Sequence, residues 1–337
     1  MLNFDEQRFL RIQSGALALA DDIHATVGQL LADGARNLVF LGSGGAGILM
    51  HPAARLLQTR STFPVFVEMP AELVVTGSVH LGEGSIVVIP SLSGTTSESV
   101  EALEYCKARG ATVLVLTGHA DTPLGEQAGH SFVNFAEDDT SCESFYLQSL
   151  LLALSLMHHR GEYDDYAWVL SELAPLPRLL LEVKRAFEPR AAELAVQLKD
   201  EPFHIITGAG STWPEAFYYG MCILEEMQWI RTRPVHASDF FHGTLELVEE
   251  GVSVLLLKGE DATRPLAERV EKFAPNYTDK VCVLDAADHE MPGISDDVRA
   301  LVSPVLLATV LQRLSAHLEV LRDHPLTTRR YYKRVAY

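Results

Sequence analysis

The sequence predicts two α/β domains, each a parallel β-sheet with helices on both faces in a three-layer αβα arrangement. Three observations lead to this prediction. The chain has 337 residues, which is enough for two separate cores. Short apolar runs rich in β-branched residues alternate with helical segments. A glycine turn in the first half of the chain recurs in the second half.

The first half contains four apolar runs that we expect to be strands. Helical segments separate these runs, and the alternation indicates a parallel sheet covered on both faces. A longer helical pattern over residues 5–33 precedes them. The expected strands are residues 37–41, 64–69, 85–90 and 111–117, and the expected helices between them are residues 46–58, a short helix after residue 69, and residues 97–109.

The second half begins with long helices between about residues 140 and 200 and continues with expected strands at 203–207, 252–257 and 280–285. The turn Gly42-Ser43-Gly44 returns here as Gly208-Ala209-Gly210, again between a strand and a helix, so a duplicated domain is the natural explanation. We expect an N-terminal helix (1–34), a first α/β domain (35–160), a helical connector (161–200), a second α/β domain (201–323) and a C-terminal tail (324–337).

Composition excludes several classes of partner. The net charge of −18 repels nucleic acid and anionic lipid, so we expect neither as a partner, and any anionic ligand must be held locally. The four cysteines have no metal-binding spacing and indicate reduced core thiols. His236 and Asp239 do not complete a metal motif, so no metal is expected. No signal peptide or membrane-spanning run is present, and we expect a cytoplasmic protein.

A loop rich in hydroxyl groups follows the third expected strand. Ser91, Ser93, Thr95 and Thr96 precede the helix over 97–109. Hydroxyl and backbone N–H donors at the positive end of a helix bind phosphate without Lys or Arg. The alternative is plain helix capping by Thr95 or Thr96, which would use one or two of these hydroxyls. The second half has Lys258-Gly259-Glu260-Asp261 at the corresponding place, so only the first half keeps the anion loop.

The first glycine turn has a formal dinucleotide spacing. Gly42, Gly44 and Gly47 match GxGxxG, and Glu68 follows at about the expected distance. The anion loop two strands along favours a monophosphate instead, and tight packing between strand and helix would also explain the glycines. Ser43 and Gly44 remain candidate ligands of a bound phosphosugar.

Residues 221–243 carry the strongest signal for acid/base chemistry. Glu226 lies on an expected amphipathic helix that ends at Pro234, and His242 follows, so the two could converge on one cleft. A carboxylate beside Glu225 is also typical of a solvated helix face, and a packed or surface histidine is an equally ordinary reading. We expect Phe240 and Phe241 to seat His242 against an apolar wall.

The C-terminal segment HPLTTRRYYKRVAY concentrates basic residues in an acidic chain. Its interleaved aromatic and aliphatic residues give the tail an apolar surface with which to dock. A docked tail could supply a cation to an anionic substrate, and Arg330 and Lys333 are the candidates. A disordered basic tail is the alternative.

Three of these segments resemble one family. EMQWI (226–230), HASDFFHG (236–243) and the tail are similar to the fructosamine 6-phosphate deglycases, which include the fructoselysine 6-phosphate and 6-phosphofructose-aspartate deglycases. The loop SLSGTTSES is similar to the phosphate loop of the wider group of proteins with two sugar isomerase (SIS) domains. The resemblance covers the whole chain and implies two flavodoxin-like SIS domains.

The resemblance also implies site residues. Glu226 and His242 fall on a catalytic Glu and His, Ser91, Ser93 and Thr96 on phosphate-binding positions, and Ser141 on a sugar-contacting one. One departure is Ala46, which stands where relatives carry a substrate-contacting Ser or Thr. Relatives can take the histidine from a second subunit, which implies a homodimer with shared active sites.

The implied activity is hydrolysis of a 6-phosphofructosyl amine to glucose 6-phosphate and a free amine, with no cofactor. Glu and His would open the sugar ring, and an enaminol and an imine would follow. The alternatives are a sugar-phosphate aldose–ketose isomerase, a glucosamine-6-phosphate deaminase, and a phosphosugar sensor without catalysis.

Overall fold

The computed structural model describes residues 1–137, 142–332 and 334–335 and divides into two compact units. The first unit is Gln7–Pro177, and the second unit is Met1–Glu6 together with Arg178–Tyr337. Each unit contains one parallel sheet, with five strands in the first and four in the second. The α/β fold with two sheets is therefore confirmed.

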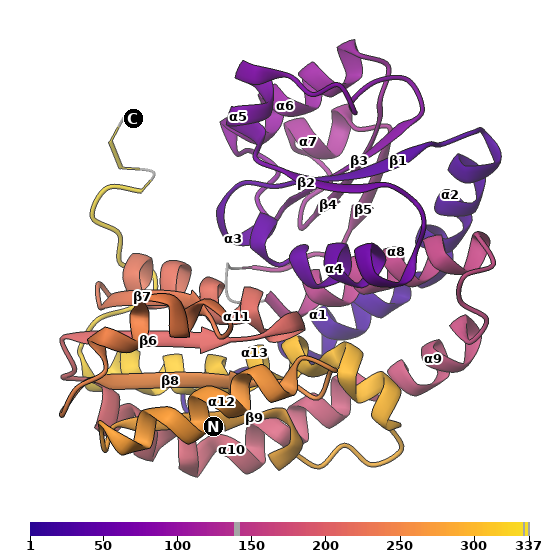
Figure 1. Cartoon of the computed structure of the whole chain (residues 1–337). Helices are drawn as coiled ribbons and strands as arrows, with labels where there is room; N and C mark the ends of the chain where they lie inside the picture. The colour runs from indigo at the N-terminus through magenta and orange to yellow at the C-terminus, as the bar shows by residue number, and fades with distance from the viewer. Residues whose placement is uncertain (138–141, 333, 336–337) are drawn as a thin grey trace. The chain divides into compact units, whose positions relative to one another are not determined.

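The sheet of the first unit has the strand order β2-β1-β3-β4-β5, and all its pairings are parallel (Figure 1). Its inner strands have buried residues on both faces, as expected for a sheet between two helical layers. The sequence did not predict β5, which is short and half exposed. The strands are β1 (Asn37–Leu41), β2 (Val65–Glu68), β3 (Ser85–Ser91), β4 (Thr112–Thr117) and β5 (His130–Val133).

Helices cover both faces of this sheet. Helices α5, α6 and α7 contribute apolar side chains to a core with Val39, Val87 and Val113. On the other side, α2 and α4 pack against the apolar helix α8. The helices are α1 (Glu6–Ala18), α2 (Ala20–Ala32), α3 (Gly44–Ile48), α4 (His51–Arg60), α5 (Pro70–Thr76), α6 (Ser97–Ala108), α7 (Pro123–Gln127), α8 (Cys142–His159) and α9 (Tyr166–Leu173). Two predicted helices, 5–33 and 46–58, are thus each divided in two.

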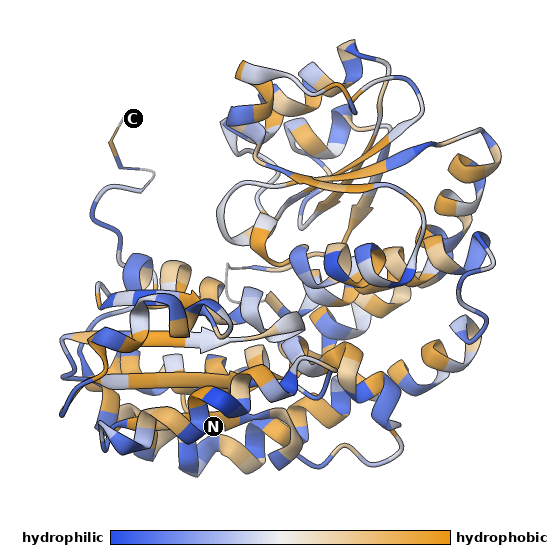
Figure 2. Ribbon diagram, viewed as in Figure 1, coloured by the Kyte–Doolittle hydropathy of each residue, from blue (hydrophilic) through white to orange (hydrophobic). Residues whose placement is uncertain are grey.

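The sheet of the second unit has the order β7-β6-β8-β9, with β7 at its edge. Figure 2 shows that apolar residues concentrate in the strands of both sheets. One face packs on α12, and the other contacts α11. The elements are β6 (Phe203–Gly208), β7 (Arg231–His236), β8 (Ser253–Lys258), β9 (Val281–Asp285), α10 (Leu176–Leu198), α11 (Trp213–Tyr218), α12 (Arg264–Phe273), α13 (Asp296–Leu321), the π-helix η2 (Tyr219–Met227) and the 3₁₀ turns η1 (Gly210–Thr212), η3 (Asp239–His242), η4 (Thr244–Leu247), η5 (Ala274–Asn276) and η6 (Ala286–Asp288).

The prediction that Pro234 ends a helix is wrong. The helix that carries Glu226 ends at Met227, and Pro234 lies inside strand β7, opposite Ile206 of β6. Proline cannot donate a backbone hydrogen bond, so within a sheet it is confined to edge strands, bulges and strand starts. Strand β7 is at the edge of its sheet and can therefore contain Pro234. The sequence does not show that this segment is an edge strand, so the proline was misread as a helix stop.

Helix α13 is long and apolar enough to cross a membrane by length and composition, yet 83% of its most apolar window is buried in the structure. It also carries a buried ion pair: the Arg313 side chain is 1% exposed and donates from Nε to Glu188 at 2.6 Å. Arg313 also donates to the carbonyl of Leu2 at 2.6 Å, which ties the N-terminal residues to the second unit. These contacts are those of a core helix.

Candidate active site

The hydroxyl-rich loop lies at the topological switch point of the first sheet. In the order β2-β1-β3, strands β2 and β3 lie on opposite sides of β1, and open α/β sheets bind ligands at the carboxyl ends of the two strands at such a point, here β1 and β3. The loop begins at Ser91, the last residue of β3, and leads into α6. Ser43 follows β1 at the same edge and donates from Oγ to Glu98 in the first turn of α6 at 3.2 Å.

The loop folds as a compact turn of hydroxyl groups. Ser91 Oγ accepts from the Gly94 N–H at 3.2 Å and lies 3.5 Å from Thr96 Oγ1. Ser93 Oγ accepts from Thr95 Oγ1 at 3.1 Å. Gly94 has φ = +63°, and a Cβ there would lie 2.1 Å from Thr122 Oγ1, so the turn requires glycine at this position.

Thr96 occupies the N-cap position of α6, but its side chain makes no capping hydrogen bond. The capping alternative is therefore not what this structure shows for Thr96. The twelve-residue helix α6 instead begins beside a half-buried hydroxyl cluster, where its N–H groups and dipole favour an anion. This arrangement fits a phosphate.

The glycines of the first turn are explained by close packing. A Cβ at Gly42 would lie 2.4 Å from Gly47 Cα, and a Cβ at Gly47 would lie 2.3 Å from the Gly42 carbonyl oxygen. Two backbone segments meet here, and their close contact explains Gly42 and Gly47 without a bound dinucleotide. Gly44 is exposed with φ = +54°, so it serves the turn itself.

In the second unit a carboxylate fills the corresponding turn. Asp261 accepts from the N–H and Oγ of Ser211 at 2.9 and 2.6 Å, and from the N–H and Oγ1 of Thr263 at 2.8 and 2.5 Å. Although burial alone would raise it, these hydrogen bonds hold the pKa of the Asp261 carboxyl below its usual value. The donors of the second glycine turn are thus used by the protein itself.

Glu226 lies on the π-helix η2 and forms an ion pair with the tail. Its Oε1 is 2.9 Å from Arg329 Nε, and the two side chains are 32% and 13% exposed. Arg329 also donates from Nη1 to the carbonyls of Leu326 and Thr328, at 2.6 and 3.0 Å, so its guanidinium is held in place by the tail's own backbone. π-Helical turns are rare and are frequent at functional sites.

Further contacts join the tail to the segment after Glu226. Gln228 Nε2 donates to the His324 carbonyl at 2.6 Å, and the Arg330 guanidinium lies 4.2 Å from the centre of the Trp229 ring. Trp229 has φ = +56°, a strained conformation for a large residue that the tail contacts stabilise. The tail therefore contacts this segment through its first residues, up to Arg330, whereas the predicted docking surface of Tyr331, Tyr332 and Val335 is exposed. Arg329 forms the ion pair with Glu226. Lys333 lies outside the described residues, as does Ser141.

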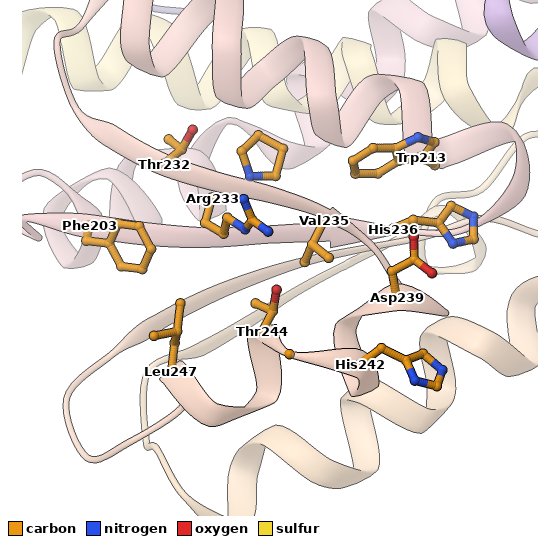
Figure 3. Close-up of a pocket in the computed structure, with 12 residues that line it drawn as sticks. Phe203, Trp213, Thr232, Arg233, Val235, His236, Asp239, His242, Thr244 and Leu247 are labelled. Atoms are coloured by element: carbon orange, nitrogen blue, oxygen red, sulfur yellow. The ribbon is translucent and has the colours of Figure 1, made fainter.

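His242 lies elsewhere in the second unit, at the end of η3, and lines a pocket of about 1180 Å³ beside the edge strand β7. His242 is exposed, so the predicted apolar wall is wrong: Phe240 is fully buried and packs with Phe241 against Phe273 instead. Figure 3 shows His242 at the end of the pocket that also holds His236 and Asp239.

Glu226 is not among the residues that line this pocket, so the structure does not bring Glu226 and His242 to one pocket. His236 and Asp239 do line it with His242. Within the part of the chain that the structure describes, no three His, Cys, Asp or Glu side chains are arranged to hold a metal ion. The four cysteines are free and buried, and burial raises the pKa of Cys106 to about 12 and that of Cys282 to about 11.

Sequence reasoning missed two residues of this region. Arg329 was visible only as one of several basic residues in the tail, and no spacing marks it as the partner of Glu226. Asp261 was noted as part of a segment without hydroxyls, but its role as an internal anion depends on the fold. The acidic residue at this position, opposite a repeated glycine turn, was the available signal.

The chain is similar to a family model, to curated proteins and to a solved structure. Residues 32–158 match the SIS domain. The fructosamine deglycase FrlB of Bacillus subtilis is 29% identical over 89% of this chain and 92% of its own length. The fructoselysine 6-phosphate deglycase of Escherichia coli is 27% identical over 92% of this chain and 89% of its own length. A solved structure from Salmonella typhimurium, described as a candidate phosphosugar isomerase, is 28% identical, with a TM-score of 0.89 over 94% of this chain and 97% of its own.

Proposed function

We propose that this chain, whose residues 32–158 form a SIS domain, is a fructosamine 6-phosphate deglycase. It hydrolyses a 6-phosphofructosyl amine to glucose 6-phosphate and a free amine or amino acid, without a cofactor. The observation that carries this proposal is the extent of the similarity. The two deglycases match about nine tenths of the chain and so both α/β units, rather than the SIS domain alone.

The phosphate loop supports the substrate class. Ser91, Ser93 and Thr96, with the N–H groups of α6, supply hydrogen-bond donors for a phosphate monoester in a chain whose net charge would repel it. Ser43, Gly44 and Thr95 complete the candidate set around the same edge of the sheet. We assign anchoring of the 6-phosphate to this loop, and the binding energy orients the reacting carbons.

Glu226 is assigned the proton transfer. In the open-chain ketose, its carboxylate removes a proton from C1 while the C2 carbonyl oxygen takes up a proton, which gives the C1–C2 enaminol. Return of the first proton to C2 and loss of the N–H proton yield the C1 imine of the aldose. Water then adds across the C=N bond, the C–N bond breaks to leave the C1 aldehyde, and the amine departs with both protons of the water. The Arg329 guanidinium at 2.9 Å stabilises the ionised carboxylate that the first step requires.

His242 is assigned the opening of the furanose ring, in which one proton passes from the C2 hydroxyl to the ring oxygen. Because Glu226 does not line the His242 pocket, we propose that the protein is a homodimer in which each chain supplies His242 to its partner. We also propose that the enzyme is cytoplasmic.

The first experiment is a coupled assay. The purified protein is incubated with a panel of 6-phosphofructosyl amino acids, and glucose 6-phosphate is measured with its dehydrogenase. We expect wild type to release glucose 6-phosphate. In Glu226→Gln, which keeps the shape of the side chain but not its basicity, the rate of release should fall about 10³-fold or more. Equal phosphosugar binding by both proteins without any turnover would favour the sensor instead, and turnover of sugar phosphates lacking an amine substituent would favour the isomerase.

Shared sites are tested by mixing two inactive variants. In a mixed dimer of Glu226→Gln and His242→Asn, one site carries both changes and the other carries neither. Unfolding and refolding the two proteins together should restore about a quarter of the wild-type rate, because half of the dimers are mixed and each has one intact site. No recovery in mixed dimers shown to have formed would mean that each chain uses its own histidine.

A further inference from the structure

The pocket beside β7 has two chemically different ends. Figure 3 shows Phe203 and Leu247 at one end and His236, Asp239 and His242 at the other. All its lining residues belong to the second unit. Strand β7 is the edge of its sheet, so among the described residues no further strand pairs with β7 on that side. With about 1180 Å³, the pocket is large enough for a ligand the size of an amino acid.

Arg233 lies between the two ends (Figure 3) and is the one Lys or Arg among the lining residues. It is exposed, and within the described residues its guanidinium makes no hydrogen bond and no ion pair. Along β7, Arg233 and Val235 lie on the same face of the strand, and Pro234 lies on the opposite face. Val235 packs in the hydrophobic core and so fixes the orientation of this face. The strand thus holds a cation with unused donors toward the pocket.

Arginine favours one class of ligand. Its planar guanidinium presents parallel N–H donors that match a carboxylate in a bidentate contact. A phosphate is the other ligand of this kind, but the hydroxyl loop of the first unit already supplies the phosphate site. In a chain of net charge −18, a local cation favours the binding of a carboxylate group.

The order of groups along the pocket then fits a carboxylate-bearing amine. Asp239 at the polar end repels a carboxylate and attracts a protonated amine, while His242 is the acid/base candidate at the same end. Phe203 and Leu247 at the opposite end provide an apolar surface for an alkyl side chain. Arg233, between them, is placed to meet the carboxylate of the same molecule.

We propose that this pocket is the subsite for the amine part of the substrate, and that Arg233 selects amines that bear a carboxylate, meaning amino acids. The inference rests on the proposed deglycase function and adds to it a residue that determines specificity. It predicts that the carboxylate improves binding, so its contribution appears mainly in KM.

The test uses substrate pairs that differ only by the carboxylate. The pairs are the 6-phosphofructosyl derivatives of glycine and methylamine, and of valine and isobutylamine. We expect wild type to favour the amino acid derivative by roughly tenfold in kcat/KM, the range of one charge-assisted hydrogen bond at an exposed site. Arg233→Gln should remove this preference, because it lowers kcat/KM on the amino acid derivative about tenfold more than on the amine derivative.

Arg231→Gln is the matched control, since Arg231 is an exposed arginine on the same strand that does not line the pocket. This variant should keep the wild-type preference. An equal loss on both members of a pair in Arg233→Gln, or a wild type without preference, would overturn the assignment while leaving the deglycase function intact. Absence of glucose 6-phosphate from every substrate with wild type would instead refute the proposed function, and this inference with it.

Discussion

Replacing Arg329 with methionine removes the cation beside Glu226 while keeping an apolar side chain of similar length. The two unit charges are joined at 2.9 Å between Nε and Oε1. Because the cation favours the ionised carboxylate, its removal makes Glu226 easier to protonate. Protonation disables the base, so activity in the variant should fail at a higher pH than in wild type.

The size of the effect follows from the geometry and the burial. At an effective dielectric constant of about 20, charges roughly 4 Å apart attract by about 4 kcal/mol before desolvation is subtracted. Exposed pairs contribute only about 0.2–1 kcal/mol. With side chains 13% and 32% exposed, this pair lies between these limits. A value of about 1.4 kcal/mol corresponds to a displacement of the acidic limb by roughly one pH unit.

The assay is the pH dependence of kcat/KM between pH 4 and 9. We expect Arg329→Met to lose activity at a higher pH than wild type on the acidic side, with little change at the alkaline end, and a smaller displacement for Arg329→Lys, which keeps the charge. A uniform loss at every pH, with the acidic limb in its original place, would refute the electrostatic role. Arg329 would then only hold the tail.

Three further predictions concern the two units separately. Thr96→Val should raise KM for 6-phosphorylated substrates roughly tenfold. Because Thr96 makes no capping bond, the free energy of unfolding should change by less than the ~1 kcal/mol expected for a lost cap. A fall in stability with an unchanged KM would contradict the phosphate role. Asp261→Asn should lose about 2 kcal/mol of stability at pH 7 by urea unfolding. The pKa of Asp261 is lowered in the native state, so this stability is present above about pH 4 and is lost as the pH falls further, a dependence the variant should lack. Burial, and the neighbouring His159 and His158, lower the pKa of His24, so the unfolded chain binds protons more readily than the native state. The free energy of unfolding should therefore fall as the pH drops below about 6.5. His24→Phe should flatten that fall in thermal unfolding between pH 5 and 7.5, and an unchanged slope would show that His24 does not cause it.

The strands could be predicted because burial on two faces leaves a continuous apolar run in the sequence. β1 and β3 were located to within a residue for this reason, since helices cover both faces of the sheet at these strands. The edge strands gave a mixed result: β2 and β9 were located to within a residue, whereas β5 and β7 were not predicted. β7 reads RTRPVH, with two exposed arginines and a proline, and nothing in that run has the period of a buried strand. An edge strand is defined by the absence of a neighbour, which is a property of the sheet and not of the segment.

The site was predicted unevenly for a similar reason. The phosphate loop is contiguous, so its hydroxyls and the helix that follows it could be recognised together. The pair Glu226–Arg329 joins residues far apart in the chain, and only the docked tail reveals which of several basic residues is used. The π-helical form of η2 and the left-handed Trp229 could not be predicted either, because both conformations are rare and local propensity does not favour them.

The two glycine turns show how a duplicated fold can keep one ligand site and close the other. Both turns present N–H and hydroxyl donors at the carboxyl end of a strand. In the first unit Ser43 Oγ donates to Glu98, but the loop after β3 carries neutral hydroxyls in place of the internal carboxylate, and we propose that this loop receives an external anion. In the second unit the Asp261 carboxylate accepts four hydrogen bonds and satisfies the donors internally. An internal carboxylate at high effective concentration excludes a dilute phosphate, so we expect one phosphorylated substrate for each chain, bound at SLSG and not at KGED.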